Sequence, residues 1–181
     1  MKKILNLLVA SVATLMLGAS CASAGILHSS VFMQKHPECK GIGDIPANYV
    51  KPEQIDCFFG YFASVMEDSA PSDIDQITRL TKVETDTKTK TITFIHNIHD
   101  VPEGIQVDKT LKVLSILLKN DACKTNQNIK AIIDLGISIE KTFYIDGKNV
   151  LNSLLNTETC EEFNKNYQKY MDEYNKLTQS Q

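Results

Sequence analysis

Hydrophobic residues recur at three- and four-residue intervals in three stretches of the chain, which is the spacing of an amphipathic helix. The first stretch covers 52–67 and has Pro52 in its first turn, where proline is favoured. The second covers 107–119. The third runs from about 125 to 135, and Gly136 suits the position just after a helix end. The pattern therefore predicts three helices before the C-terminal region.

Two other stretches have the composition of strands. Residues 77–98 are rich in threonine and β-branched residues, with Asp86-Thr87-Lys88 in the middle, and this predicts a β-hairpin. A second extended segment opens at Ile137, and Asp146-Gly147 is a strong signal for a two-residue hairpin turn. The return arm carries apolar residues as far as Leu155. Both hairpins predict antiparallel pairing.

A final helix is predicted after the second hairpin. Thr159 and Glu162 have the spacing of a capping box at its head. An aromatic stripe then follows at three- and four-residue steps, formed by Phe163, Tyr167, Tyr170 and Tyr174. We expect this stripe to pack on the sheet, and an exposed stripe that binds a partner is the alternative. The whole pattern predicts an α+β fold, with a small antiparallel sheet of two hairpins packed by about four helices.

The first 24 residues differ in kind from the rest. Lys2 and Lys3 precede an apolar run at 4–17, and Ala22-Ser23-Ala24 matches a cleavage site. This order is typical of a bacterial secretory signal peptide, and the run is too short for a membrane span. We therefore expect a signal peptide at 1–24, an irregular N-terminal arm at 25–50 and a single α+β domain at 51–181.

Cys21 offers a second interpretation of the leader. Small residues precede it, as in lipoprotein processing, but Gly18 stands where a bulky aliphatic residue is expected. Ordinary cleavage before Gly25 is the better match, so we expect a soluble exported protein ahead of a lipid-anchored one. The chain would meet the membrane only if Cys21 is lipidated, and the mass of the mature N-terminus decides between the two.

Four cysteines remain after processing, at 39, 57, 123 and 160. An even number in an exported chain indicates two disulfides, although four cysteines allow three connectivities. We favour Cys39–Cys57 and Cys123–Cys160, because each pair brackets one contiguous unit. A four-cysteine metal site is the alternative, but none of the spacings is C-x-x-C.

Charge argues against nucleic-acid binding. Removal of Lys2 and Lys3 leaves 17 basic and 22 acidic side chains, a net charge of −5, and Arg79 is the only arginine. Nucleic-acid sites favour a basic surface with arginine forks.

Sequence signatures of catalysis are also few. The chain has no G-x-S-x-G nucleophile elbow and no glycine-rich phosphate loop. The candidate metal ligands are His96, His99 and Asp100, which a loop would have to fold onto one zinc or copper ion. We therefore expect no cofactor, and we favour a protein without enzymatic activity.

Two stretches carry a resemblance to a known family. The first leads from Pro71 through Thr78-Arg79-Leu80 to a threonine-rich strand that ends near Phe94. The second contains Cys123, Leu135-Gly136-Ile137, Phe143-Tyr144-Ile145-Asp146-Gly147 and Cys160. This second half resembles the β-type pilotin lipoproteins of type II secretion. The resemblance spans about residues 70–160 and implies a disulfide-tied α/β domain that escorts secretin subunits to the outer membrane. It also implies the Cys123–Cys160 bond.

Our leading interpretation is an exported, non-enzymatic cell-envelope protein that binds another envelope protein, for which the resemblance suggests a secretin or another secretion-system component. A periplasmic metal-binding protein or enzyme that uses His96, His99 and Asp100 is one alternative. A secreted effector that acts on a host is another. Recovery of a partner from envelope extracts distinguishes the first class best.

Overall fold

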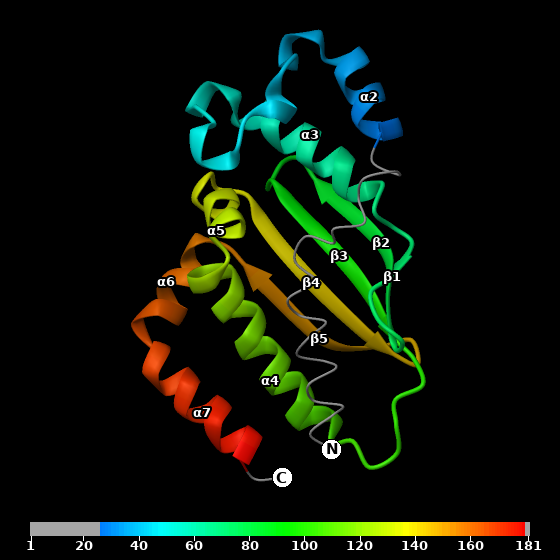
Figure 1. Ribbon diagram of the computed structural model, residues 1–181, viewed down its shortest axis with the longest axis vertical. Helices are drawn as coiled ribbons and strands as arrows, with labels where there is room; N and C mark the ends of the chain where they lie inside the picture. Colours follow the sequence, from blue (N-terminus) through cyan, green and yellow to red (C-terminus); the bar gives the residue numbers. More distant parts are fainter. Residues whose placement is uncertain (1–25, 180–181) are drawn as a thin grey trace.

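A computed structural model describes residues 26–179, and its centre is one five-stranded sheet (Figure 1). The spatial order of the strands follows the chain. The strands are β1 (Ser72–Asp73), β2 (Thr78–Asp86), β3 (Thr91–Ile98), β4 (Ser138–Ile145) and β5 (Lys148–Leu155). The α+β fold class and both hairpins are thereby confirmed. β1 is an addition, because the sequence predicted no strand before residue 77.

The two hairpins meet through a parallel pair. β2–β3 and β4–β5 are antiparallel, but β3 and β4 run in the same direction. A parallel connection needs a crossover of a dozen residues or more, and α4 and α5 supply it between the two strands. The β4–β5 turn places Asp146 at φ 51° and Gly147 at φ 74°, which the predicted tight turn requires.

Six helices accompany the sheet in the described part of the chain, two more than the sequence predicted. They are α2 (Ile26–Lys35), α3 (Ile55–Glu67), α4 (Val107–Asn120), α5 (Gln127–Asp134), α6 (Thr157–Lys165) and α7 (Tyr167–Gln179). The predicted helices at 52–67, 107–119 and 125–135 correspond to α3, α4 and α5. Of the two additional helices, one is α2. The other arises because a break divides the predicted last helix into α6 and α7.

The helices cover one face of the sheet. Alternate residues of the two central strands are buried there, namely Ile92 and His96 on β3 and Ile139 and Phe143 on β4. These apolar residues belong to one core cluster with the buried side chains of α3, α4 and α5. Most of the intervening side chains, such as Ile95, are only partly buried, although Thr142 is buried. Since strand side chains alternate between faces, the helices pack mainly on the face that carries the first set.

The N-terminal arm was predicted to be irregular. It is instead a helix followed by three short 3-10 turns. The turns are η1 (Pro37–Cys39), η2 (Ile42–Asp44) and η3 (Ala47–Tyr49). Figure 1 shows the arm at one end of the molecule, beside α3. The sequence concealed this helix because α2 has no clear apolar stripe, and its position depends on contacts with α3.

Two glycines let the arm approach α3 closely. A Cβ atom at Gly60 would lie 2.5 Å from the Phe32 ring, and a Cβ atom at Gly43 would lie 2.5 Å from the Tyr61 ring. Atoms at such separations overlap, so both positions need a residue without a side chain. One ring from each partner thus fits against a glycine of the other.

The last helix begins and packs differently from the expectation. Its N-cap is Asn156, whose Oδ1 accepts a 2.8 Å bond from the Thr159 backbone N–H, while the Thr159 hydroxyl accepts from the Asn156 N–H. Thr159 is therefore the third helical residue and not the cap. A break at Asn166 then separates α6 from α7.

The aromatic stripe lies against α4 and not against the sheet. α7 contacts α4 and α6, and Figure 1 shows α4 between α7 and the sheet. Tyr170 stacks on Phe163 with ring centroids 5.0 Å apart, and the Lys119 amine lies 5.5 Å from the Tyr170 ring centroid. Tyr167 remains 37% exposed.

The predicted signal peptide at 1–24, with Cys21, lies outside the described residues. Within the described range, every helix is too short or too polar to cross a bilayer. The boundary between arm and domain at residue 50 stays a prediction.

Candidate functional site

The two edges of the sheet are built differently. On one side, the two-residue strand β1 covers part of β2 and follows directly after Pro71. On the other side, β5 is eight residues long, and no strand of the described chain pairs with its outer side. A strand edge presents unpaired N–H and C=O groups, and proteins usually shorten, charge or cover such edges. β5 contains no proline and a single charged residue, Lys148.

The side chains of β5 lie on two faces of the strand, one buried in the core and one exposed. Ser153 and Leu155 face the core and are at most 2% exposed. Leu154 lies on the opposite face, opposite Glu140, and is 41% exposed. α4 and α6 contact the strand. β5 is therefore a fixed and open edge with an exposed apolar side chain, which is what an added extended segment requires.

The sequence showed the strand but not its exposure. The Asp146-Gly147 turn and the alternation after it were sufficient to predict β5. Its place at the edge depends on the parallel pairing of β3 with β4, which no local pattern specifies. None of the residues predicted as site residues lies on this edge.

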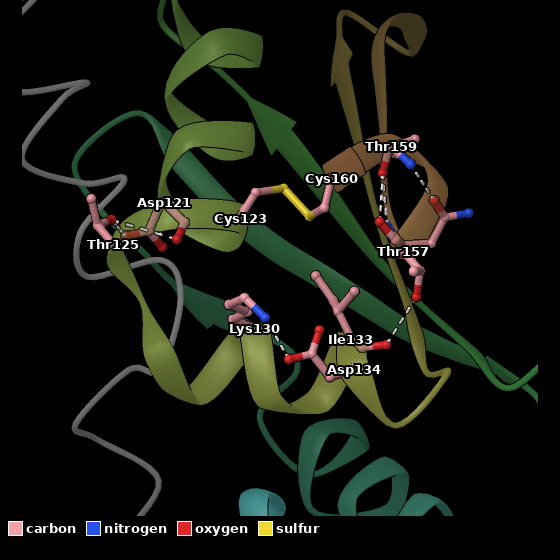
Figure 2. The surroundings of a disulfide bond; sticks show 10 residues. Asp121, Cys123, Thr125, Lys130, Ile133, Asp134, Thr157, Thr159 and Cys160 are labelled. Atoms are coloured by element: carbon pink, nitrogen blue, oxygen red, sulfur yellow. Dashed lines mark hydrogen bonds and ion pairs between the residues drawn. A yellow bond between two sulfur atoms is a disulfide. The ribbon is translucent and has the colours of Figure 1, made fainter. Parts of the chain in front are cut away.

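Both predicted disulfides are confirmed. Cys39 and Cys57 join the arm to α3 with their Cα atoms 5.3 Å apart. Cys123 and Cys160 join the turn η5 (Asp121–Thr125) to the first part of α6, with their Cα atoms 5.2 Å apart (Figure 2). Since all four cysteines of the described chain are paired, none of them offers a free thiol.

A lysine of β4 lies inside the core. Lys141 is 2% exposed in the middle of β4, and its amine lies 5.6 Å from the centroid of the Phe94 ring. Burial lowers the pKa of this amine to about 8, and the negative charge of Asp121 opposes that shift. Ser153 is its cross-strand neighbour, and the Ser153 hydroxyl has no hydrogen-bond partner among the described residues.

The predicted metal ligands do not converge. The His96 ring is 1% exposed and stacks on Phe143, with centroids 4.6 Å apart. Burial, and then the positive charge of Lys141, lowers the pKa of His96 to about 3. His99 and Asp100 follow the end of β3 and are exposed. The described residues contain no group of three or more His, Cys, Asp or Glu side chains placed to hold a metal ion.

Comparisons with known proteins give structural similarities only. No protein-family model matches the sequence, and no curated protein matches it. One similar solved structure is a candidate secreted protein from Pseudomonas aeruginosa, with a TM-score of 0.46 and 9% identity over 61% of this chain and 96% of that one.

Two further similar structures are pilotins of type II secretion. They are EpsS from Vibrio vulnificus, with 10% identity, and AspS from Vibrio cholerae, with 16% identity. Each has a TM-score of 0.45 and covers 60% of this chain and 94% of its own. At these identities and scores, the similarity does not assign a function.

Proposed function

We propose that this chain is an exported cell-envelope protein that binds another envelope protein by adding an extended segment of the partner to the free edge of β5. The observation that carries the proposal is the eight-residue edge strand with no strand of the described chain on its outer side. In β-augmentation, main-chain hydrogen bonds supply the affinity and alternate side chains supply the specificity. Leu154 would be the first side chain that the added segment meets.

Export is supported by two independent features. The order of charged, apolar and small residues at 1–24 is that of a signal peptide. Two disulfides indicate an oxidising compartment such as the periplasm. In this proposal the mature protein consists of the arm at 25–50 and one α+β domain at 51–181. Lipidation at Cys21 would attach it to the outer membrane instead of leaving it soluble.

The partner in this proposal is a secretin subunit of type II secretion, which follows from the resemblance of residues 70–160 to pilotins. A pilotin-like chaperone would dock a segment of its partner against a sheet edge or an apolar groove. An open strand edge beside an exposed leucine fits that task. No enzymatic step is part of the proposal.

The test is affinity purification from envelope extracts with two matched variants. Leu154→Lys places a charge on the edge, as natural edge strands do to prevent pairing. Val31→Lys is the control, because Val31 is also 41% exposed but belongs to α2 in the arm. We expect the wild type and Val31→Lys to recover a secretin, and Leu154→Lys to recover at least about tenfold less, a loss of roughly 1.4 kcal/mol.

Two results would contradict parts of the proposal separately. Equal recovery by Leu154→Lys and the wild type would exclude the edge of β5 as the binding site. Recovery of no secretin by the wild type, in cells that assemble one, would exclude the pilotin-like role.

A further inference from the structure

The charges around β5, the last strand of the sheet, are arranged so that its edge fits a second copy of itself (Figure 1). The strand carries one charge, at its first residue, Lys148, and α6 begins two residues after the strand ends, with Glu158 in its first turn. An antiparallel copy places the Lys148 end of each strand toward the α6 end of the other, so opposite charges approach at both ends. A parallel copy would bring like charges together, which is unfavourable.

The backbone of β5 is regular over the part that such a copy would use. Residues 151–155 pair one by one with β4, whereas the register skips Val150. Within 151–155, Asn152 and Leu154 are exposed, and they lie on the same face because strand side chains alternate. Leu154 is the one large apolar side chain of β5 that is exposed, with 41% of its surface accessible. The regular stretch of the edge therefore carries an apolar contact point near its end.

A two-fold axis at Leu154 gives this side chain a partner of its own kind. In an antiparallel pair, directly opposite residues have Cα atoms roughly 4.5–5.5 Å apart, so the two copies of Leu154 would cover one another. Burial of apolar surface drives such association. A two-fold contact uses the same patch on both copies and leaves no free edge on that side of either sheet.

We propose that two copies of this chain pair through the edges of β5 when no other protein occupies them, as an antiparallel two-fold dimer with Leu154 at its axis. The dimer covers a strand edge that would otherwise attract unrelated extended chains. Since the contact is limited to short strands, it belongs to the weak, transient class of interfaces and gives way to a partner segment. This protective role rests on the proposed function, but the contact itself needs no secretin.

The first test is disulfide cross-linking of purified Leu154→Cys with diamide as the oxidant. All four cysteines of the described chain are paired, so a bond between chains reports the introduced thiol. Opposite Cα atoms in the dimer fall within the roughly 4.4–6.8 Å that a disulfide spans. Val31→Cys is the matched control, because Val31 is equally exposed but lies in α2. We expect Leu154→Cys to form covalent dimers at least about tenfold faster, since association raises the effective thiol concentration.

The second test is sedimentation equilibrium of the purified protein, with no secretin present. The wild type and Val31→Lys should dimerise with the same dissociation constant. Leu154→Lys should raise that constant at least about tenfold, because two ammonium groups would meet at the axis.

These measurements are independent of the proposed function, because a failure to recover a secretin leaves the dimer unaffected. Two results would overturn the dimer and leave secretin binding open. One is a wild type that stays monomeric at concentrations up to about 1 mM. The other is cross-linking of Leu154→Cys that is no faster than that of Val31→Cys.

Discussion

The arm and the sheet are two regions of this molecule that hold their shape by different means. The sheet region follows from regular hydrophobic periods, and both cysteines of its disulfide are buried, with Cys123 2% exposed and Cys160 8% exposed. The arm consists of one helix and three short 3-10 turns, held by rings that fit against glycines and by the Cys39–Cys57 bond, in which Cys39 is buried and Cys57 is partly exposed. The comparison indicates that the sheet should lose stability as a unit, whereas the arm should detach by itself.

Removal of the core disulfide should have the largest effect on stability. The Cys123–Cys160 bond closes 37 residues, which the chain-entropy model equates with about 4 kcal/mol. We expect Cys123→Ala/Cys160→Ala to lose about that much free energy of unfolding, measured by urea denaturation. An unchanged urea midpoint would show that the core does not depend on this bond.

Removal of the arm disulfide should have a smaller and local effect. Cys39–Cys57 closes 18 residues, which corresponds to about 3 kcal/mol. In Cys39→Ala/Cys57→Ala we expect faster hydrogen exchange at 30–50, while the amides of β3 and β4 keep their protection. Equal loss of protection in both regions would mean that the arm and the sheet form one cooperative unit.

Acid should weaken the sheet region through His96. The pKa of His96 is about 3 in the folded chain and 6.5 in the unfolded chain. Between these values the unfolded state binds more protons, so stability falls as the pH falls from 6.5 toward 3. The loss between pH 7 and pH 5 amounts to about 2 kcal/mol.

Urea titrations at pH 7 and pH 5 measure this pH dependence of the free energy of unfolding. Two leucine variants show which histidine causes it. His96→Leu should remove most of the slope. His99→Leu is the matched control, because His99 is exposed after the end of β3. If His96→Leu keeps the slope of the wild type, another group is responsible.

Adding a side chain at Gly60 should weaken the packing of the arm on α3, with a smaller effect than the changes above. Gly60→Ala places a methyl group 2.5 Å from the Phe32 ring, and overpacking of this kind costs about 1–2 kcal/mol. The change should appear as faster exchange in α2. A double-mutant cycle with Phe32→Leu provides the control, because removing the ring should relieve the clash. Additive effects would contradict the contact.

Zinc addition should give the smallest difference of all: the binding heats of the wild type and of a variant without His96 and His99 should be equal. His96 is enclosed in the core while His99 is exposed, so one ion cannot reach both rings in this fold. Calorimetry with zinc should therefore give the same heats for the wild type and for His96→Ala/His99→Ala. A binding heat present only in the wild type would revive the metal site.

Local sequence signals were sufficient wherever one segment determines its own structure. The hairpin turn at Asp146-Gly147 and the helical periods at 52–67 and 107–119 each formed as predicted. The pairing of the cysteines was also correct, because each bond joins two cysteines that follow one another in the mature sequence.

Structure that depends on distant contacts was not predicted. The parallel pairing of β3 with β4, and with it the free edge of β5, depends on the path of the chain through α4 and α5. The sequence predicted His96 as a metal ligand. In the fold it is a core residue that stacks on Phe143, a contact that no local pattern specifies. α2 lacks a clear apolar stripe, so its place is set by Gly60 on α3.

Photo-crosslinking in living cells tests most directly whether the free edge of β5 is the docking site. A photoreactive amino acid replaces Leu154 in one strain and Val31 in a second, and the products are identified by mass spectrometry. Docking at β5 predicts a secretin adduct from position 154 and none from position 31. An adduct from position 31 alone, or from neither position, would contradict it.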